Sequence, residues 1–340
     1  MPNEQYYSTV EITRASADAL RAVGVPTDDA DLVADALVSA DRRGIYSHGL
    51  LRLPLYVNAL VAGGMNPTPQ LRWRVEHGAV AVLQADSAMG QVSMAAAVDR
   101  AAILAESFGI GMVAVEGSTH YGAGNYWSDR LTARGLIGIV TSTTGPVVAP
   151  YGGSTSVIGT NPLTIGAPSA AGQALTADLA TSAGAYGKVL AARNAGTTIP
   201  EGWAVDPSGA PTTDPAEAIA GSLIAFGGHK GSAIAVLLEA ISASLTNANF
   251  AAETVDIWST PSSVMNTGHT VIAIDPNAFV GRDHTAARIA TLQDRVRSSG
   301  EHALAPGDPE FARAQAAAEQ VAFAGATVAA LDELWQRLGV

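Results

Sequence analysis

Residues 43–56 (RGIYSHGLLRLPLY) bring an imidazole, a guanidinium and a phenol into one short segment. A histidine can take or give a proton near neutral pH, and an arginine can bind a carboxylate through two parallel hydrogen bonds. In an α-helix begun just before His48, the four-residue spacing would put His48, Arg52 and Tyr56 on one stripe. Pro54 would kink or end that helix. The segment is therefore either a helix start with a surface charge or a site.

Three other kinds of catalytic site are disfavoured by the sequence. The chain has no cysteine, which excludes a thiolate nucleophile, a zinc–thiolate site and a disulfide framework. A serine hydrolase is disfavoured because G-x-S-x-G is absent and because Ser47, on a helix, would point about 100° away from His48. No two histidines show a metal-binding spacing such as H-x-x-x-H. Four histidines lie outside the polar clusters: His77, His269, His284 and His302. They are interpreted as ordinary surface residues or as residues whose ring nitrogens are hydrogen-bonded within the protein.

The charge balance narrows the class of partner. With 340 residues and 48% hydrophobic content, the chain can bury a large core, and its length suggests about two domains. The net charge of −12 disfavours nucleic acid and anionic membranes, because both need clustered Lys and Arg. The polar, acidic N-terminus does not resemble an export signal, and no apolar run approaches the roughly 18 residues of a spanning helix. We therefore expect a soluble, cytoplasmic protein with a small-molecule substrate.

Helices and strands alternate along most of the chain. The helix expected over 28–42 follows a break at Pro26, is capped by Thr27 and leads directly into the polar segment. From about residue 79, short apolar runs separated by helical patterns predict a sheet packed with helices. Residues 150–215 are rich in Gly, Pro, Thr and Ser, which predicts mostly irregular chain. Further helices are expected over residues 11–23, 123–134, 283–298, 308–322 and 327–338.

One apparent cofactor motif is rejected. The stretch GIGMVA, with Gly109, Gly111 and Ala114, matches the dinucleotide fingerprint G-x-G-x-x-A. In that fingerprint the glycines leave a strand and open a helix whose amides meet the pyrophosphate. Here the order is reversed, because the glycines follow a helical pattern and precede the strand MVAVEG. We therefore interpret Gly109 as the residue that ends a helix.

Polar residues also gather at four Gly-rich corners, the kind of place where a backbone turn can hold a ligand. His120 ends a strand beside two glycines, where backbone amides can face a ligand. Asp178 is expected to leave a strand, with Thr181 or Ser182 opening the next helix. Any one such corner is more often a simple turn. The other two corners are GTNPLTIGAP and FGGHKG.

Taken in order, these segments resemble one known enzyme family, the type-2 malate/L-lactate dehydrogenases. The similar segments, in the order and spacing of that family, are GIYSHGLLRLPLY, STHYGAG, PYGG…IGTNPL, DLATSAGAYGKV, IPEGWAVDPSGAPTTDP, GGHKG and GHTVIAIDP. The family includes ureidoglycolate dehydrogenase, diketogulonate reductase, sulfolactate dehydrogenase and Δ1-piperideine-2-carboxylate reductase. The resemblance runs from about residue 10 to the C-terminus, and it leaves the substrate open.

The resemblance implies an oxidoreductase that passes a hydride between NADH or NADPH and a small 2-oxo or 2-imino acid. It implies His48 as the proton donor or acceptor, with Ser47 as its polar neighbour. Arg52 is implied to bind the substrate carboxylate, Tyr56 and Thr160 to contact the substrate, and no metal is expected. The residues implied to contact the dinucleotide are His120, Tyr121, Gly122, Gly124, Asp178, Leu179, Ala180, His229, Lys230, Gly300 and Glu301.

The fold implied by the resemblance is α/β (α+β), with a non-Rossmann NAD(P)-binding sheet domain and a helical domain formed by the N- and C-terminal segments. We expect residues 1–75 with 300–340 to form the helical domain that carries the Ser-His-Arg motif, and residues 76–299 to form the NAD(P)-binding domain. A homodimer is implied, and the low charged content of 15% favours an apolar interface. Two alternatives stay open: a reductase of cyclic or N-alkyl imino acids and, less favoured, a non-catalytic ligand-binding protein of the same fold.

Overall fold

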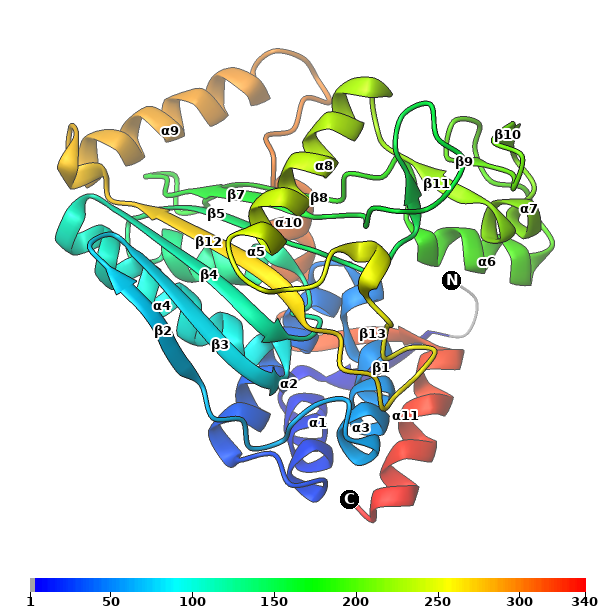
Figure 1. The fold of residues 1–340 in the computed structure, drawn as a ribbon. Helices are drawn as coiled ribbons and strands as arrows, with labels where there is room; N and C mark the ends of the chain where they lie inside the picture. Colours follow the sequence, from blue (N-terminus) through cyan, green and yellow to red (C-terminus); the bar gives the residue numbers. More distant parts are fainter. Residues whose placement is uncertain (1–3) are drawn as a thin grey trace.

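A seven-stranded sheet runs through the centre of the protein, and the computed structural model describes residues 4–340 (Figure 1). The strands lie in the order β2 (Arg72–His77), β3 (Val80–Ala88), β4 (Ile110–Ser118), β12 (Thr267–Ile274), β5 (Ile137–Ser142), β7 (Leu163–Ala167) and β8 (Leu175–Leu179). β3 and β4 pair in parallel, and the other five neighbouring pairs are antiparallel. The fold is therefore mixed α/β, with a mainly antiparallel sheet.

Helices cover both faces of this sheet. In Figure 1, α8 (His229–Ser244) crosses in front of the sheet, and α4 (Gly90–Phe108) and α5 (Gly124–Thr132) lie behind it. Gly109 ends α4 in a left-handed conformation with φ 83°, and β4 follows directly, so the interpretation of GIGMVA as a helix end is confirmed. At Gly111 a Cβ atom would lie 2.1 Å from the carbonyl oxygen of Ala101, which shows how closely α4 packs on β4.

A helical layer lies below the sheet in Figure 1, where the two ends of the chain come together. Its helices are α1 (Thr9–Ala22), α2 (Thr27–Arg42), α3 (Leu53–Ala62) and α11 (Gly325–Leu338). An antiparallel pair of strands, β1 (Glu4–Ser8) and β13 (Gln320–Ala324), joins the N-terminal to the C-terminal segment. The division of the chain near residues 75 and 300 stays a prediction.

Two details of the helical layer differ from expectation. Thr27 is the first residue of α2 rather than its cap; Pro26 takes the cap position, and no side chain caps the helix. The helix expected over 308–322 is confirmed only over its first part, because α10 (Asp308–Ala316) ends early and β13 follows. In β13, Val321 and Phe323 are buried and alternate with more exposed residues, which is the two-residue period of a strand.

A smaller sheet forms a separate lobe at the right of Figure 1, within the region expected to be mostly irregular. Thr181 and Ser182 open no helix there: Ser182 makes an isolated bridge with Ala225, and the next helix begins at Tyr186. The elements of this lobe are β6 (Val148–Ala149), β9 (Ala204–Val205), β10 (Pro211–Thr212), β11 (Ser222–Ile224), α6 (Tyr186–Ala195) and α7 (Pro215–Ala220). Outside this lobe lie η3 (Ala251–Glu253), η4 (Pro276–Ala278) and α9 (Arg282–Arg297). α9 confirms the helix expected over 283–298.

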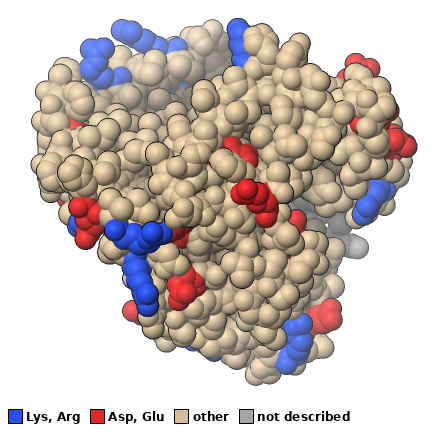
Figure 2. Space-filling model, in the orientation of Figure 1, with Lys and Arg blue, Asp and Glu red and all other residues tan. Residues whose placement is uncertain are grey.

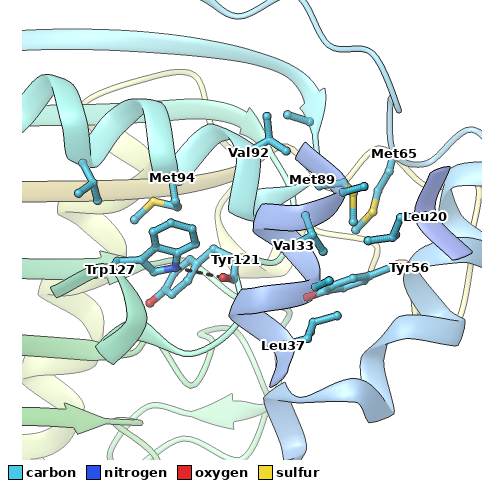
Figure 3. Packing of buried hydrophobic residues seen from close by; sticks show 14 of the residues in the cluster. Leu20, Val33, Leu37, Tyr56, Met65, Met89, Val92, Met94, Tyr121 and Trp127 are labelled. Atoms are coloured by element: carbon cyan, nitrogen blue, oxygen red, sulfur yellow. Dashed lines mark hydrogen bonds between the residues drawn. The ribbon is translucent and has the colours of Figure 1, made fainter. Parts of the chain in front are cut away.

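One continuous core joins the helical layer to the sheet. Figure 3 shows Leu20, Val33 and Leu37 of the helical layer near Met89 and Met65, with Trp127 and Met94 farther along the same cluster. The Trp127 indole donates a hydrogen bond of 3.1 Å to the carbonyl oxygen of Tyr121. Among residues 4–340, no helix combines the length and apolar character needed to cross a membrane.

Candidate active site

The segment with His48, Arg52 and Tyr56 folds as two tight turns followed by a helix. The turns are η1 (Tyr46–His48) and η2 (Leu50–Arg52), and Gly49 between them is extended. The single helix begun at Ser47 is therefore wrong. Pro54 lies in the first turn of α3 instead of ending a helix, because proline has no N–H to leave unpaired and its fixed φ suits the first turn.

The turns are anchored by a carboxylate that the sequence reading missed. Asp41, in the last turn of α2, is buried, and its Oδ2 accepts a hydrogen bond of 2.7 Å from the amide of Leu50. A Cβ atom at Gly49 would lie 2.0 Å from Oδ1 of Asp41, so only glycine permits this contact. Burial raises the pKa of Asp41 to about 7. An acidic residue at the carboxyl end of a helix, where the dipole disfavours it, was the available signal.

His48 is held by its neighbour in the turn. The Oγ of Ser47 lies 2.8 Å from Nδ1 of His48, so the expectation that Ser47 points away from the imidazole is wrong. The tight turn, with fewer residues per turn than an α-helix, brings the two side chains together. Nε2 of His48 has no hydrogen-bond partner in residues 4–340. Burial, and then the charge of Arg52, lower the pKa of His48 to about 4.

Arg52 is fixed at one edge of its guanidinium and stacked on an indole. Its Nε donates a 2.7 Å hydrogen bond to the carbonyl oxygen of Ser47, and its guanidinium carbon lies 4.5 Å from the centre of the Trp258 ring. Within the described chain, no carboxylate lies at ion-pair distance from Arg52. Burial lowers its pKa, against the influence of Tyr56 and Asp256. Trp258 comes from the loop between α8 and β12, and no motif marked it.

A second histidine stands beside the first. The rings of His48 and His120 are stacked, with centroids 5.3 Å apart and planes 26° apart. His120 comes from the corner between β4 and α5, and its Nδ1 lies 2.6 Å from the hydroxyl of Tyr56 on α3. Gln91, in the first turn of α4, donates a 3.1 Å hydrogen bond to that same hydroxyl. The sequence reading missed Gln91, which belongs to no recognised motif.

His48, His120 and Trp258 line a cavity of about 910 Å³ between the helical layer and the sheet. This volume is at the upper end of the range for small-molecule sites. Arg52 and Tyr56 do not line it themselves, but they contact the lining residues Trp258 and His120. His229, Lys230, Gly300 and Glu301 are exposed elsewhere. The predicted residues that line it are Ser47, His48, His120, Tyr121, Gly122, Gly124, Thr160, Asp178, Leu179 and Ala180.

The cavity wall carries polar atoms suited to a bound polar ligand. Four buried atoms of lining residues have no hydrogen-bond partner within residues 4–340: Tyr121 Oη, Asn125 Oδ1, Thr176 Oγ1 and Thr267 Oγ1. Unpaired buried polar atoms are costly unless a ligand or water pairs them. The first backbone amides of α5 are less available to a ligand than expected, because Asp178 accepts a 2.9 Å hydrogen bond from the Asn125 amide. Within the described chain, no cluster of metal-ligating side chains occurs.

The comparisons with known proteins agree with one another. A family model for malate/L-lactate dehydrogenase matches residues 7–332. The L-sulfolactate dehydrogenase of Methanothermobacter thermautotrophicus is 37% identical over 89% of this chain and 88% of its own. The (2R)-3-sulfolactate dehydrogenase (NADP(+)) of Chromohalobacter salexigens is 38% identical over 84% and 87%, and the ureidoglycolate dehydrogenase (NAD(+)) of Escherichia coli O157:H7 is 33% identical over 93% and 89%. These homologues are thus NAD(+)- or NADP(+)-dependent dehydrogenases.

Solved structures show the same fold. Sulfolactate dehydrogenase from Methanocaldococcus jannaschii superposes with a TM-score of 0.93 at 33% identity, covering 99% of this chain and 98% of that one. Δ1-Piperideine-2-carboxylate reductase from Pseudomonas syringae gives a TM-score of 0.89 at 31% identity, covering 97% and 99%. The likeness therefore extends over the helical layer, the sheet and the small lobe alike.

Asp41→Asn should change how stability depends on pH. The folded chain keeps the Asp41 proton up to about pH 7, whereas an ordinary carboxyl releases it near 3.8. The folded state binds more protons across that window, so the contribution of Asp41 to stability is present at low pH and is lost as pH rises. As pH rises through this window, the free energy of unfolding measured in urea should fall for wild type, relative to the variant, by up to about 1.4 kcal/mol per pH unit.

The matched control is Asp35→Asn, which removes an exposed carboxylate from the same helix. Its stability curve should run parallel to that of wild type. In Asp41→Asn the new side chain can still accept the hydrogen bond from Leu50 through its amide oxygen, so the turn should keep its shape. Parallel curves for wild type and Asp41→Asn would contradict the assignment of a raised pKa.

Proposed function

Because the chain belongs to the malate/L-lactate dehydrogenase family, we propose that it transfers a hydride between NAD(P)H and a small 2-oxo acid at the cavity beside His48. The family consists of oxidoreductases that act on hydroxy acids. One observation carries the proposal: two complementary groups meet in one pair of anchored turns. His48 has a free imidazole edge, and Arg52 has no carboxylate partner within residues 4–340.

These two groups match the two ends of a 2-oxo acid. The free edge of the Arg52 guanidinium can take the carboxylate through parallel charge-assisted hydrogen bonds, which fixes the position of the neighbouring C2 atom. Bound NAD(P)H supplies the hydride to C2. As the C2–oxygen π bond breaks, its electron pair moves to the oxygen, and His48 passes a proton from Nε2 to that atom. The product is a 2-hydroxy acid, and the reverse reaction uses neutral His48 as the base.

The protonation state of His48 depends on the substrate. In the free cavity, burial and Arg52 keep its pKa low, so the imidazole is neutral at pH 7 and ready to accept a proton from a hydroxy acid. A bound carboxylate neutralises the charge of Arg52 and adds a negative charge nearby, and both effects favour the imidazolium. In the reducing direction, His48 therefore takes up its proton together with the acid.

The dinucleotide is proposed to occupy the remainder of the cavity, on a non-Rossmann sheet. The unpaired atoms of Tyr121, Asn125 and Thr267 support this, since a nicotinamide carboxamide, ribose hydroxyls and phosphates offer both donors and acceptors. The sheet is mainly antiparallel, and its β3–α4 and β4–α5 junctions carry no G-x-G-x-x-G sequence. Contacts from His229, Lys230, Gly300 and Glu301 stay predictions, because none of them lines the cavity.

A reductase of cyclic or N-alkyl imino acids is the second candidate. The likeness to Δ1-piperideine-2-carboxylate reductase of Pseudomonas syringae favours it. An imino acid presents the same carboxylate to Arg52, and the hydride adds to C2 of a C=N bond instead of C=O. A panel of 2-oxo acids, with and without an added amine, assayed with NADH and NADPH by loss of absorbance of the reduced nicotinamide, separates the two. Turnover that requires the amine favours the second candidate, and absence of any turnover contradicts both.

We further propose a homodimer that forms through the outer face of α8. Ile234, Leu237, Ile241 and Leu245 repeat at helical spacing along that face and are exposed. The only carboxylate of the helix, Glu239, is buried, and Figure 2 shows the surface over α8 as largely free of charge. Two copies that each carry a net charge of −12 repel one another, so they can meet most favourably at an uncharged face.

His48→Ala should lower kcat by roughly 10²-fold or more, because it removes the general acid. The dissociation constant of the dinucleotide should change little, since His48 contacts the acid and not the cofactor. Steady-state rates with the best 2-oxo acid, and fluorescence titration with NADH, measure the two effects. Near-wild-type turnover in this variant would remove His48 from the mechanism.

Arg52→Lys should raise KM for the acid about tenfold or more while affecting kcat less. A lysine ammonium is a point charge and cannot form two parallel bonds to a carboxylate, and it lacks the flat face that stacks on Trp258. Initial rates over a range of acid concentrations at saturating dinucleotide measure the change. An unaltered KM would mean that another group holds the carboxylate.

Leu237→Glu should convert the protein to monomers, because it places charge at the centre of the proposed interface. An obligate dimer interface buries about 2,000 Å² or more, and it tolerates an unpaired charge poorly. Light scattering should give about twice the mass of the chain for wild type and the mass of one chain for the variant. Val10→Glu, at an exposed apolar position of α1, is the matched control and should remain dimeric. A monomeric wild type would refute the proposal.

A further inference from the structure

We propose that Glu239 is a positioning residue, whose buried carboxylate holds together two walls of the acid site: residues 159–161 and the loop that carries Trp258. The acid site is the part of the cavity beside His48 and Arg52. This inference rests on the proposed function, in which the acid binds there. Glu239 does not line the cavity, so it acts through the residues that it holds.

Glu239 occupies a position on α8 where helical spacing predicts a residue without charge. It lies in the middle of the buried face, between Ala235 and Ser242, with 5% of its surface exposed. Within residues 4–340 no lysine or arginine forms an ion pair with it. Burying a carboxylate is costly unless it is paired or hydrogen-bonded, so hydrogen bonds must compensate for the burial of Glu239.

One oxygen of this carboxylate holds the chain on both sides of Thr160. Oε2 of Glu239 accepts hydrogen bonds of 3.3 Å from the Gly159 amide and 2.8 Å from Nδ2 of Asn161. Nδ2 of Asn161 also donates a 3.0 Å hydrogen bond to the carbonyl oxygen of Ala235, so both of its N–H groups are used. Thr160, which lines the cavity, is therefore fixed from both of its neighbours.

The other oxygen holds the start of the loop between α8 and β12. Oε1 of Glu239 accepts a 2.7 Å hydrogen bond from the amide of Ala251, the first residue of η3. In Figure 1 this loop, in yellow, leaves the end of α8 and runs down to the helical layer. Trp258 lies on the loop seven residues after Ala251 and lines the cavity. A single carboxylate thus joins two cavity walls that are distant along the chain.

The position of the Trp258 loop matters for the acid because of what its indole contacts. The indole centre lies 4.5 Å from the guanidinium carbon of Arg52, and its edge meets the ring of His120, with centroids 5.3 Å apart. Displacement of the loop therefore moves the surface against which Arg52 is held. Since Arg52 is proposed to bind the carboxylate, a loosened loop should weaken binding of the acid more than binding of the dinucleotide.

The carboxylate is hydrogen-bonded only to donors, so glutamine is a poor substitute for it. Glutamine has the size of glutamate, but it replaces one acceptor oxygen by an NH₂ group that can only donate. In the place of Oε2 that group would face the Gly159 amide and Nδ2 of Asn161. In the place of Oε1 it would face only the Ala251 amide. The second orientation loses fewer hydrogen bonds, so Glu239→Gln should release Ala251 and keep Gly159.

Native-state hydrogen exchange tests these contacts in the protein without substrate. In Glu239→Gln the Ala251 amide should exchange about tenfold or more faster than in wild type, because it loses a hydrogen bond to a charged group. The Gly159 amide and the amides of the central strand β4 should keep their rates. Unchanged exchange at Ala251 would overturn the proposal, and so would an equal acceleration at all of these amides, which indicates a general loss of stability.

The matched control is Glu253→Gln, which changes an exposed carboxylate of the same loop. Glu253 accepts one hydrogen bond, of 2.9 Å, from the Phe250 amide, and the amide oxygen of glutamine can still accept it. Exchange at Ala251 and the kinetic constants should therefore match those of wild type. Faster exchange at Ala251 in this control as well would mean that loss of any carboxylate loosens the loop, which contradicts the assignment to Glu239.

Steady-state kinetics then test whether the released loop affects the acid site. In Glu239→Gln, KM for the best acid should rise about threefold to tenfold, while kcat and the NADH dissociation constant stay within about twofold. An unchanged KM beside faster exchange at Ala251 would refute the positioning role, and so would weaker NADH binding at unchanged KM. If wild type turns over no 2-oxo or imino acid, the proposed function fails, while the exchange rates still decide whether Glu239 holds the two walls together.

Discussion

The hydrogen bond from the Leu50 amide to Asp41 ties the active-site turn to the rest of the molecule. It joins the end of α2, whose other face is part of the main core, to the two turns that carry His48 and Arg52. Gly49 is needed at this point because any side chain would collide with the carboxylate. Burying a carboxyl is costly, and here the buried group sets the positions of His48 and Arg52 together.

Beside these turns, most titratable side chains of the site are uncharged at neutral pH. His48 and His120 are kept neutral by burial, and Tyr56 keeps its proton, so Arg52 is the one group beside the two histidines that is charged at neutral pH. Trp258 gives Arg52 a π face in place of a counter-ion. A guanidinium without an ion-pair partner favours an incoming anion, and a bound anion would favour the charged form of His48.

Local patterns predicted the helices well and the turns poorly. Helical periodicity located α2 and α9 to within a few residues, and the order of helix before glycine, at the end of α4, correctly rejected the dinucleotide fingerprint. The turn at Ser47 and His48 was misread because a four-residue spacing suits a helix, and the contact between Gly49 and Asp41 that breaks the helix is invisible in a local pattern. Gln91 and Trp258 were missed for a related reason: each reaches the site from an element that is distant along the chain.

The pairing of β1 with β13 has a consequence for biosynthesis. Glu4 pairs with Ala324, so the first strand to leave the ribosome waits for nearly the whole chain before it finds its partner. Contacts between such distant residues form late, because the entropy of closing a long loop must be overcome first. α11 packs against both α3 and η2. The turn that carries Arg52 therefore lacks these contacts until the end of the chain has been synthesised. A chain that lacks α11 therefore lacks the contacts that support the turn with Arg52.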